Sequence, residues 1–285
     1  MKLKKKKIFL GTAQFLSKYG MVNNNKDLSY KHFFNILEYA GKNSIFNYDT
    51  APDYNSEEII GHFISANKIK NAKILTKIPK IRTSDYQTFV EKSISNSLKK
   101  LNSDIYTLFF HSTTDIKLFL KDPNFFINLK RKFPIKNIGF SVYEPKDLKE
   151  VLKRKIKISI QFPCNALNSS FLPLLRKFFF KPLFARSIFL QGILLKKINN
   201  KKINPELRNS VKNYINFLTK NRISPLEFNL SFINDQKIID YHIFGIEKEK
   251  QLNDIINTNF SKFDSYNAHK IEKFFNKKLI DPRTW

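Results

Sequence analysis

Short apolar runs alternate with longer amphipathic segments along the whole chain. The short runs are rich in Ile, Phe, Leu and Tyr and are bounded by polar residues, which is typical of buried strands. The longer segments repeat apolar residues every three or four positions, which favours amphipathic helices. Strands are therefore expected at residues 6–12, 43–49, 72–77, 104–111, 136–141, 157–163, 182–190 and 240–246.

Helices are expected between these strands, and several carry sequence signals at their ends. Ser224 followed by Pro225 is a typical helix start, because serine caps the first turn and proline suits its first position. Pro123 is expected to interrupt a helix or to mark its boundary. The expected helices cover residues 29–42, 56–67, 85–101, 115–132, 144–154, 169–179, 204–220, 224–235 and 247–258, with a further helix and an extended end over about 262–285.

Eight strand-then-helix units in one chain predict a parallel sheet covered by helices. The chain has 285 residues, and a closed (β/α)8 barrel, the TIM barrel, usually needs about 250. An open doubly wound sheet would usually carry a G-x-G-x-x-G fingerprint after its first strand, whereas the sequence there is LGTAQFLSKYG. No linker rich in Pro, Gly or Ser divides the chain, so we expect an α/β protein with one barrel domain over residues 1–285.

The formal net charge of +27 raises the question of a nucleic acid or membrane surface as partner. The lysines are scattered along the chain, however, and only Lys2–Lys7 and Lys196–Lys202 form clusters. Lys, Asn, Ile, Phe and Tyr are all abundant while Gly is scarce, so the charge fits a general compositional bias. We expect no specific nucleic acid and no membrane, although the charge favours an anionic cofactor or substrate.

Cysteine content and hydropathy favour a cytoplasmic protein. Cys164 is the only cysteine, so no disulfide can form within the chain, which fits a reducing compartment. No run of about 18 apolar residues exists, so no membrane-spanning helix is expected. The five histidines show no metal-ligand spacing, and we expect no metal site.

Polar side chains follow the ends of three consecutive expected strands. Asp49 ends the second strand, Lys77 the third and His111 the fourth. Tyr54 lies just after the second strand. A barrel gathers the carboxyl ends of its strands around one mouth, where catalytic groups of this fold lie. Each residue alone is more often a surface, cap or core residue, but four compatible types at three consecutive strand ends indicate a site.

These four residue types are suited to proton transfer. A tyrosine is a poor acid near neutral pH because its reference pKa is about 10, and a nearby lysine ammonium lowers that pKa. Asp49 would keep Lys77 charged and in place, and a histidine can hydrogen-bond a substrate oxygen. Such a site protonates a carbonyl oxygen while the carbonyl carbon accepts a hydride, and a cofactor must supply that hydride.

The chain resembles the aldo/keto reductase family over almost its whole length. The Asp-to-Tyr spacing followed by Ser-Glu, and a later Gln-Gly, are its specific signals. The resemblance implies an NAD(P)H-dependent carbonyl reductase with Tyr54 as the acid. Lys77 and Asp49 would tune its pKa, and His111 would orient the substrate. The matching segments are LGTAQF and KYG within 10–20, FNYDTAPDYNSEEIIG (46–61), ILTKIPK (74–80), DIYTLFFH (104–111), IGFSVYEP (138–145), IQFPCNALN (160–168), RSIFLQGIL (186–194) and FGIEKEKQL (244–252).

The resemblance extends in part to the cofactor site. Ser141 and Gln161 match residues that hold the nicotinamide amide, but Val142 stands where the family has Asn, and Asn165 is a candidate for the missing hydrogen bond. Arg186 stands where the family often stacks a Tyr on the nicotinamide, and a guanidinium can also stack on a ring. The resemblance implies cofactor contacts from Ser141, Gln161, Arg186, Ser187, Gln191, Gly192, Gly245, Lys248 and Gln251.

The turn after the last expected strand is where the family binds the cofactor phosphates, at the amides of a helix start. Lys248 could meet a 2′-phosphate there, although Glu247 would repel one. We therefore expect NADP(H), with NAD(H) as the alternative, and a small carbonyl substrate of sugar-like or anionic type. The lysine cluster at 196–202 is expected either to close over the pyrophosphate or to be a solvated charge run.

Two other kinds of function stay open. A non-catalytic barrel could act as a cofactor-binding regulatory subunit or as a basic nucleic-acid-binding protein. The intact set of four residues argues against a regulatory subunit. The lack of aromatic residues among the basic clusters argues against a nucleic-acid-binding protein. An aldolase could use Lys77 as a Schiff base, but such a lysine should be neutral, and Asp49 works against neutrality.

Overall fold

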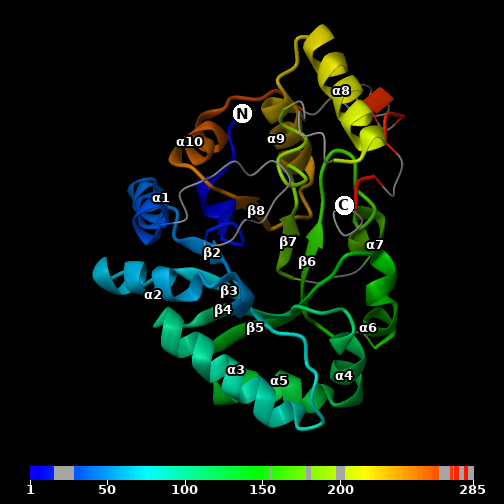
Figure 1. Cartoon of the computed structure of the whole chain (residues 1–285). Helices are drawn as coiled ribbons and strands as arrows, with labels where there is room; N and C mark the ends of the chain where they lie inside the picture. The colour runs from blue at the N-terminus through cyan, green and yellow to red at the C-terminus, as the bar shows by residue number, and fades with distance from the viewer. Residues whose placement is uncertain are drawn as a thin grey trace.

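Eight parallel strands form a closed barrel in the computed structural model, and helices surround it (Figure 1). The structure describes residues 1–15, 29–154, 156–177, 181–196, 203–262, 270–271, 273–275 and 279–281. Each strand pairs with its neighbour in the sequence, and β8 closes the barrel on β1. The predicted TIM barrel is therefore confirmed. The strands are β1 (Ile8–Gly11), β2 (Asn47–Asp49), β3 (Lys73–Ile78), β4 (Ile105–Phe110), β5 (Ile135–Ser141), β6 (Ser159–Pro163), β7 (Leu183–Arg186) and β8 (Tyr241–Gly245).

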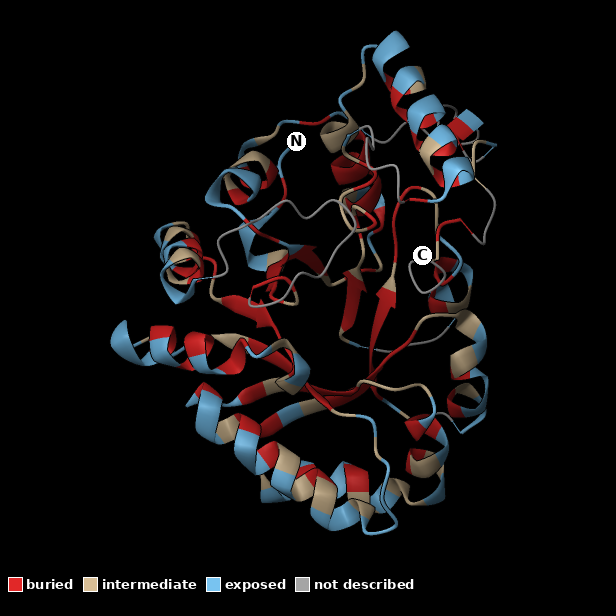
Figure 2. Cartoon of the chain, viewed as in Figure 1, coloured by how far each residue is buried: buried red, intermediate tan, exposed pale blue. Residues whose placement is uncertain are grey.

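The helices follow the strands and turn their apolar faces toward the barrel. Buried residues line the strands and the barrel-facing sides of the helices, while the outer helix faces are exposed (Figure 2). The α-helices are α1 (Tyr30–Lys42), α2 (Glu57–Ala66), α3 (Tyr86–Leu101), α4 (Asp115–Lys121), α5 (Pro123–Lys132), α6 (Lys149–Lys153), α7 (Leu172–Arg176), α8 (Pro205–Lys220), α9 (Pro225–Asp235) and α10 (Glu249–Asn257). Short 3-10 helices are η1 (Lys5–Lys7), η2 (Pro52–Tyr54) and η3 (Pro145–Leu148).

Aromatic rings fill the inside of the barrel. The Phe184 ring meets the rings of Phe9 and Phe109 edge to face, each with centroids 5.5 Å apart. At the amino-terminal ends of the strands, the Lys73 ammonium donates to the Tyr241 hydroxyl at 2.9 Å. A barrel packed in this way is closed along its axis, so ligands can be held only at a mouth.

Side-chain caps explain where two helices begin. Asp122 accepts a hydrogen bond from the Phe125 amide, and Pro123 occupies the first turn of α5. The expected helix at 115–132 is therefore two helices, divided at the proline. Ser224 caps α9 by accepting from the Glu227 amide, as its sequence predicts.

Several expected segments are longer than the elements observed, and three of them show why. The second strand begins at Asn47 rather than at 43, because the chain turns at Ser44 with a left-handed φ of 59°. The seventh strand ends at Arg186 rather than at 190, because a turn with several positive φ angles follows it. The helix expected at 169–179 is the short α7, and residues 178–180 lie outside the described part.

The tail expected over about 262–285 lies mostly outside the described residues. Of its described residues, Ile271, Leu279 and Ile280 are buried against the main core. That contact fits one domain over residues 1–285, which stays a prediction. Within the described residues, we find no helix whose length and apolar character would let it cross a membrane.

Candidate active site

The four residues expected to carry the chemistry lie together at the carboxyl ends of the strands. Asp49 ends β2, Lys77 lies on β3, and Tyr54 ends the short helix η2. His111 follows β4 directly. The Lys77 ammonium lies 4.7 Å from the centre of the Tyr54 ring. Residues far apart in the sequence therefore meet at one mouth of the barrel.

Lys77 and Asp49 form a buried ion pair. The Lys77 ammonium donates to Asp49 Oδ1 at 3.0 Å and to the Thr50 carbonyl at 2.7 Å. Lys77 is 2% exposed and Asp49 is 6% exposed. Burial lowers the pKa of Lys77, and the charge and hydrogen bond of Asp49 oppose that fall. The carboxylate thus opposes the loss of charge from the ammonium, which in its charged form favours the phenolate of the neighbouring tyrosine.

His111 lies against Tyr54, with the two rings edge to face and their centroids 5.9 Å apart. Burial, followed by the nearby charge of Lys77, lowers the pKa of His111 to about 4. Its Nδ1 atom is 3.6 Å from Asp53, which is longer than a hydrogen bond. The imidazole is therefore neutral at pH 7 and can donate one N–H to a substrate oxygen.

Ser141 and Gln161 join the same network, a connection that the sequence alone does not reveal. The Ser141 hydroxyl donates to Gln161 Oε1 at 2.7 Å, and Gln161 Nε2 donates to Asp49 Oδ1 at 2.8 Å. A buried chain of hydrogen bonds thus runs from β5 through β6 and β2 to Lys77 on β3. The pairing of Ser141 with Gln161 in register across β5 and β6 makes this chain possible.

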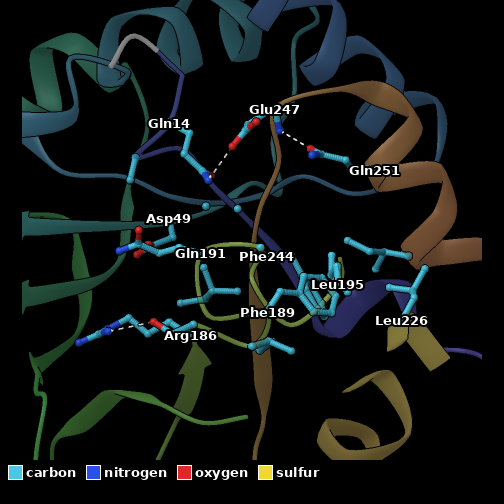
Figure 3. A pocket seen from close by; sticks show the side chains of 18 of the residues that line it. Gln14, Asp49, Arg186, Phe189, Gln191, Leu195, Leu226, Phe244, Glu247 and Gln251 are labelled. Atoms are coloured by element: carbon cyan, nitrogen blue, oxygen red, sulfur yellow. Dashed lines mark hydrogen bonds between the residues drawn. The ribbon is translucent and has the colours of Figure 1, made fainter. Parts of the chain in front are cut away.

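A pocket of about 460 Å³ opens above these residues (Figure 3). Asp49, Tyr54 and His111 line it, whereas Lys77 lies beneath. Of the residues expected to contact the cofactor, all but Lys248 line this pocket: Ser141, Gln161, Arg186, Ser187, Gln191, Gly192, Gly245 and Gln251. Of the lysine cluster at 196–202, only Lys196 lies in the described part, and it lines the pocket.

The turn after β7 forms one wall of the pocket. Ser187, Leu190, Gln191 and Gly192 all have positive φ angles, between 46° and 86°. Three of these are not glycine, and such strained backbone is concentrated at functional sites. The buried Asn165 donates to the Ser187 carbonyl at 3.1 Å and accepts from the Leu167 amide at 3.0 Å, and it does not line the pocket. Asn165 thus holds this turn and does not replace the missing nicotinamide contact.

The turn between β8 and α10 differs from the expectation. Gln251 Oε1 accepts from the Glu247 and Lys248 amides, at 2.7 and 3.1 Å. Glu247 faces the pocket and accepts a hydrogen bond of 3.0 Å from Gln14 (Figure 3). Lys248 is exposed and does not line the pocket. Sequence reasoning assigned Gln14 no role; its only signal was a polar residue inside an apolar run.

The donors and acceptors of the pocket fit a nicotinamide cofactor. An amide ligand needs both an acceptor and a donor: the Ser141 oxygen has lone pairs beyond its observed bond, and Gln161 Nε2 has a second N–H beyond the one that it donates to Asp49. The lining of the pocket extends from Tyr54 to Gln251 and Asp254 on α10. Among the described residues, no cluster of three or more His, Cys, Asp or Glu side chains could hold a metal ion.

Comparisons with known proteins identify the family and the fold. The model of the aldo/keto reductase family matches residues 7–276. An aldo-keto reductase from Bacillus halodurans, in its holo form, is similar in structure with a TM-score of 0.76 and 16% identity, over 98% of this chain and 95% of that chain. A glycerol dehydrogenase from Gluconobacter oxydans has a TM-score of 0.66 and 17% identity, over 97% and 93% of the two chains.

At these identities the solved structures show a shared fold. No curated protein matches the chain in sequence. The family match covers nearly the whole barrel, including every strand that contributes to the pocket. The chain therefore belongs to the aldo/keto reductase family, whose members are oxidoreductases that act on carbonyl compounds.

Proposed function

We propose that the protein is an NAD(P)H-dependent reductase that converts the carbonyl group of an aldehyde, ketone or sugar-like substrate into an alcohol. The observation that carries the proposal is the convergence of Tyr54 and His111 over the buried Lys77–Asp49 pair. In a barrel that acts only as a regulatory subunit, we would not expect a buried ion pair beneath a pocket tyrosine, because such pairs seldom add stability.

When bound, the reduced cofactor supplies a hydride to the carbonyl carbon. Tyr54 donates its phenolic proton to the carbonyl oxygen, so that the alcohol forms without a free alkoxide. The Lys77 ammonium stabilises the phenolate that Tyr54 becomes. His111, neutral because its pKa is lowered to about 4, donates an N–H to the same oxygen and sets its direction.

The cofactor would be held by the residues that line the long pocket. Ser141 presents an oxygen atom and Gln161 an N–H to a carboxamide, and the turn of Ser187–Gly192 flanks them. The start of α10 lies at the other end, near Gln251. This arrangement supports a nicotinamide at the Tyr54 end and the adenosine half toward α10. We place the enzyme in the cytoplasm, where its single cysteine would stay reduced.

Fluorescence titration of the purified protein with NADPH and with NADH tests the proposal. We expect saturable binding of at least one reduced cofactor. A screen of aldehydes, ketones and sugars should then show cofactor oxidation at 340 nm that Tyr54→Phe abolishes. If neither cofactor binds, or if turnover does not depend on Tyr54, the proposed function is wrong.

A further inference from the structure

Arg186 is held rigidly at the end of β7, on the wall of the pocket. Its Nη2 atom donates to the Val142 carbonyl at 2.9 Å, and its Nη1 atom donates to the Ser187 hydroxyl at 3.2 Å. The guanidinium carbon lies 4.4 Å from the centre of the Tyr143 ring, so the cation also lies over an aromatic face. These contacts hold the guanidinium in place. A guanidinium has five N–H donors, which is more than these two hydrogen bonds use.

Within the part of the chain that the structure describes, the charge of Arg186 has no counter-ion. Its observed partners are a carbonyl, a hydroxyl and a ring, all neutral. Within the described residues, no Asp or Glu forms an ion pair with it, whereas Lys77 is neutralised by Asp49. A half-buried cation without a partner costs free energy, which an anion bound at the same place would offset.

The unpaired charge lies at the reacting end of the pocket. Arg186 donates to the carbonyl of Val142, the residue that follows Ser141 at the carboxyl end of β5. Burial and then Lys77 lower the pKa of His111, Asp53 and Asp49 oppose that fall, and Arg186 makes the smallest contribution to it. Of the pocket carboxylates, Asp49 is paired with Lys77, and Glu247 and Asp254 come from the β8–α10 end. Figure 3 shows Arg186 on one side of Asp49 and Glu247 on the other. An anionic ligand would therefore be drawn toward the catalytic end.

We propose that Arg186 binds an anionic group, a carboxylate or a phosphate, on the carbonyl substrate. This inference rests on the proposed function and narrows the substrate to carbonyl compounds that carry a negative charge. A planar guanidinium matches the paired oxygens of such groups and can donate to two of them at once. The Tyr143 ring and the Val142 carbonyl prepare its plane before the substrate arrives.

A binding experiment tests the inference without requiring catalysis. Benzoate and the uncharged benzamide are titrated calorimetrically into wild type, Arg186→Met and Arg186→Lys. Arg131 on the exposed face of α5 supplies a matched control, Arg131→Met, with the same change in net charge. We expect wild type and Arg131→Met to prefer benzoate, and Arg186→Met to lose about 10- to 100-fold in benzoate affinity, the range for bonds to a charged group. Arg186→Lys should keep part of the preference.

A kinetic experiment adds the substrate and separates it from the cofactor. The kcat/KM for 4-formylbenzoate should exceed that for its methyl ester, and Arg186→Met should remove most of that ratio. NADPH and NADH affinities, measured in parallel, separate an effect on the substrate from an effect on the cofactor. Equal benzoate binding by wild type and Arg186→Met would overturn the inference, as would an equal loss in Arg131→Met. Weaker cofactor binding with unchanged benzoate binding would assign Arg186 to the cofactor. If benzoate binding depends on Arg186 but the protein shows no reductase activity, only the proposed function is rejected.

Discussion

Gln161 Nε2 donates to the same Asp49 oxygen that accepts from the Lys77 ammonium. The two hydrogen bonds are 2.8 and 3.0 Å long, and Gln161 is fully buried. Gln161, which we propose as a contact of the nicotinamide amide, is thus also a direct hydrogen-bond partner of the ion pair beneath Tyr54. Substitution at Gln161 should consequently affect proton transfer as well as cofactor binding.

Gln161→Met should lower kcat near neutral pH and move the basic limb of the pH–rate profile to higher pH. The physical reason is that Asp49 loses a donor and holds Lys77 less firmly, so Tyr54 becomes a weaker acid. Ser141→Ala is the matched control, because Ser141 contacts Gln161 but not Asp49. It should weaken cofactor binding and leave the profile in place. Identical profiles for the two variants would show that Gln161 serves the cofactor alone.

Tyr54→Phe removes only the phenolic hydroxyl, and the ring contacts with Lys77 and His111 can persist. We expect kcat to fall by about 10²- to 10⁴-fold, the usual contribution of a general acid. The affinity for reduced cofactor should stay close to that of wild type, which places the loss in the chemical step. Parallel measurements of turnover and NADPH titration check this. Near wild-type turnover would mean that Tyr54 is not the acid.

Lys77→Met should impair both catalysis and folding. Tyr54 loses the cation that makes it more acidic, so kcat should fall. Asp49 keeps only the Gln161 donor in a buried place, and breaking one side of a buried ion pair typically costs about 3–5 kcal/mol. Urea unfolding measures the second effect and steady-state kinetics the first. Because Tyr54→Phe removes no charge, it should reproduce the kinetic loss without the loss of stability, and equal destabilisation of both variants would contradict this account.

His111 should make the folded state less stable as the pH falls. Burial and Lys77 lower its pKa to about 4, whereas the unfolded chain has a pKa of about 6.5. As the pH falls, the unfolded state therefore binds the proton before the folded state does. The contribution of neutral His111 to the stability of the folded state is present above pH 6.5 and is lost as the pH falls toward 4. The slope from one such histidine is at most about 1.4 kcal/mol per pH unit.

Urea unfolding at pH 7, 6 and 5 tests this dependence by comparing wild type with His111→Gln. The variant should lose less stability than wild type over that range. The fully buried His242, whose pKa burial lowers to about 3, contributes in the same direction and is unchanged in both proteins. Parallel stability curves for the two proteins would show that His111 does not account for the slope.

Glu247→Gln should raise the affinity for NADPH relative to NADH. Glu247 faces the pocket near α10, while Lys248 does not line it, so the Glu247 carboxylate rather than the Lys248 ammonium would meet a 2′-phosphate. Burial raises the pKa of Glu247, but its bond from Gln14 and the nearby Lys196 favour the charged form. Fluorescence titrations with both cofactors measure the ratio. Lys248→Gln is the matched control and should change the ratio less; the opposite order would restore Lys248 as the residue that selects NADPH.

The sequence by itself was sufficient to predict the barrel and the group at its mouth. The alternation of apolar runs with amphipathic segments is a local periodicity, which can be recognised in the sequence without knowing any tertiary contact. Asp49, Lys77 and His111 could be placed together because parallel strands carry their carboxyl ends to one face. The helix start at Ser224 was equally local, since a cap depends on residues three positions apart. Pro123 indicated an interruption or a boundary, and the structure shows that a new helix begins there.

Tertiary structure alone decided which polar groups are partners. The strand expected to reach residue 190 ends at Arg186, because the following turn is stabilised by Asn165 from another loop. Lys248 and Glu247 are neighbours in the chain, yet only Glu247 faces the pocket, where Gln14 from the opposite end of the sequence holds it. Such choices depend on side-chain direction and burial across strands, which local pattern does not encode, because the partners are joined only when the barrel closes.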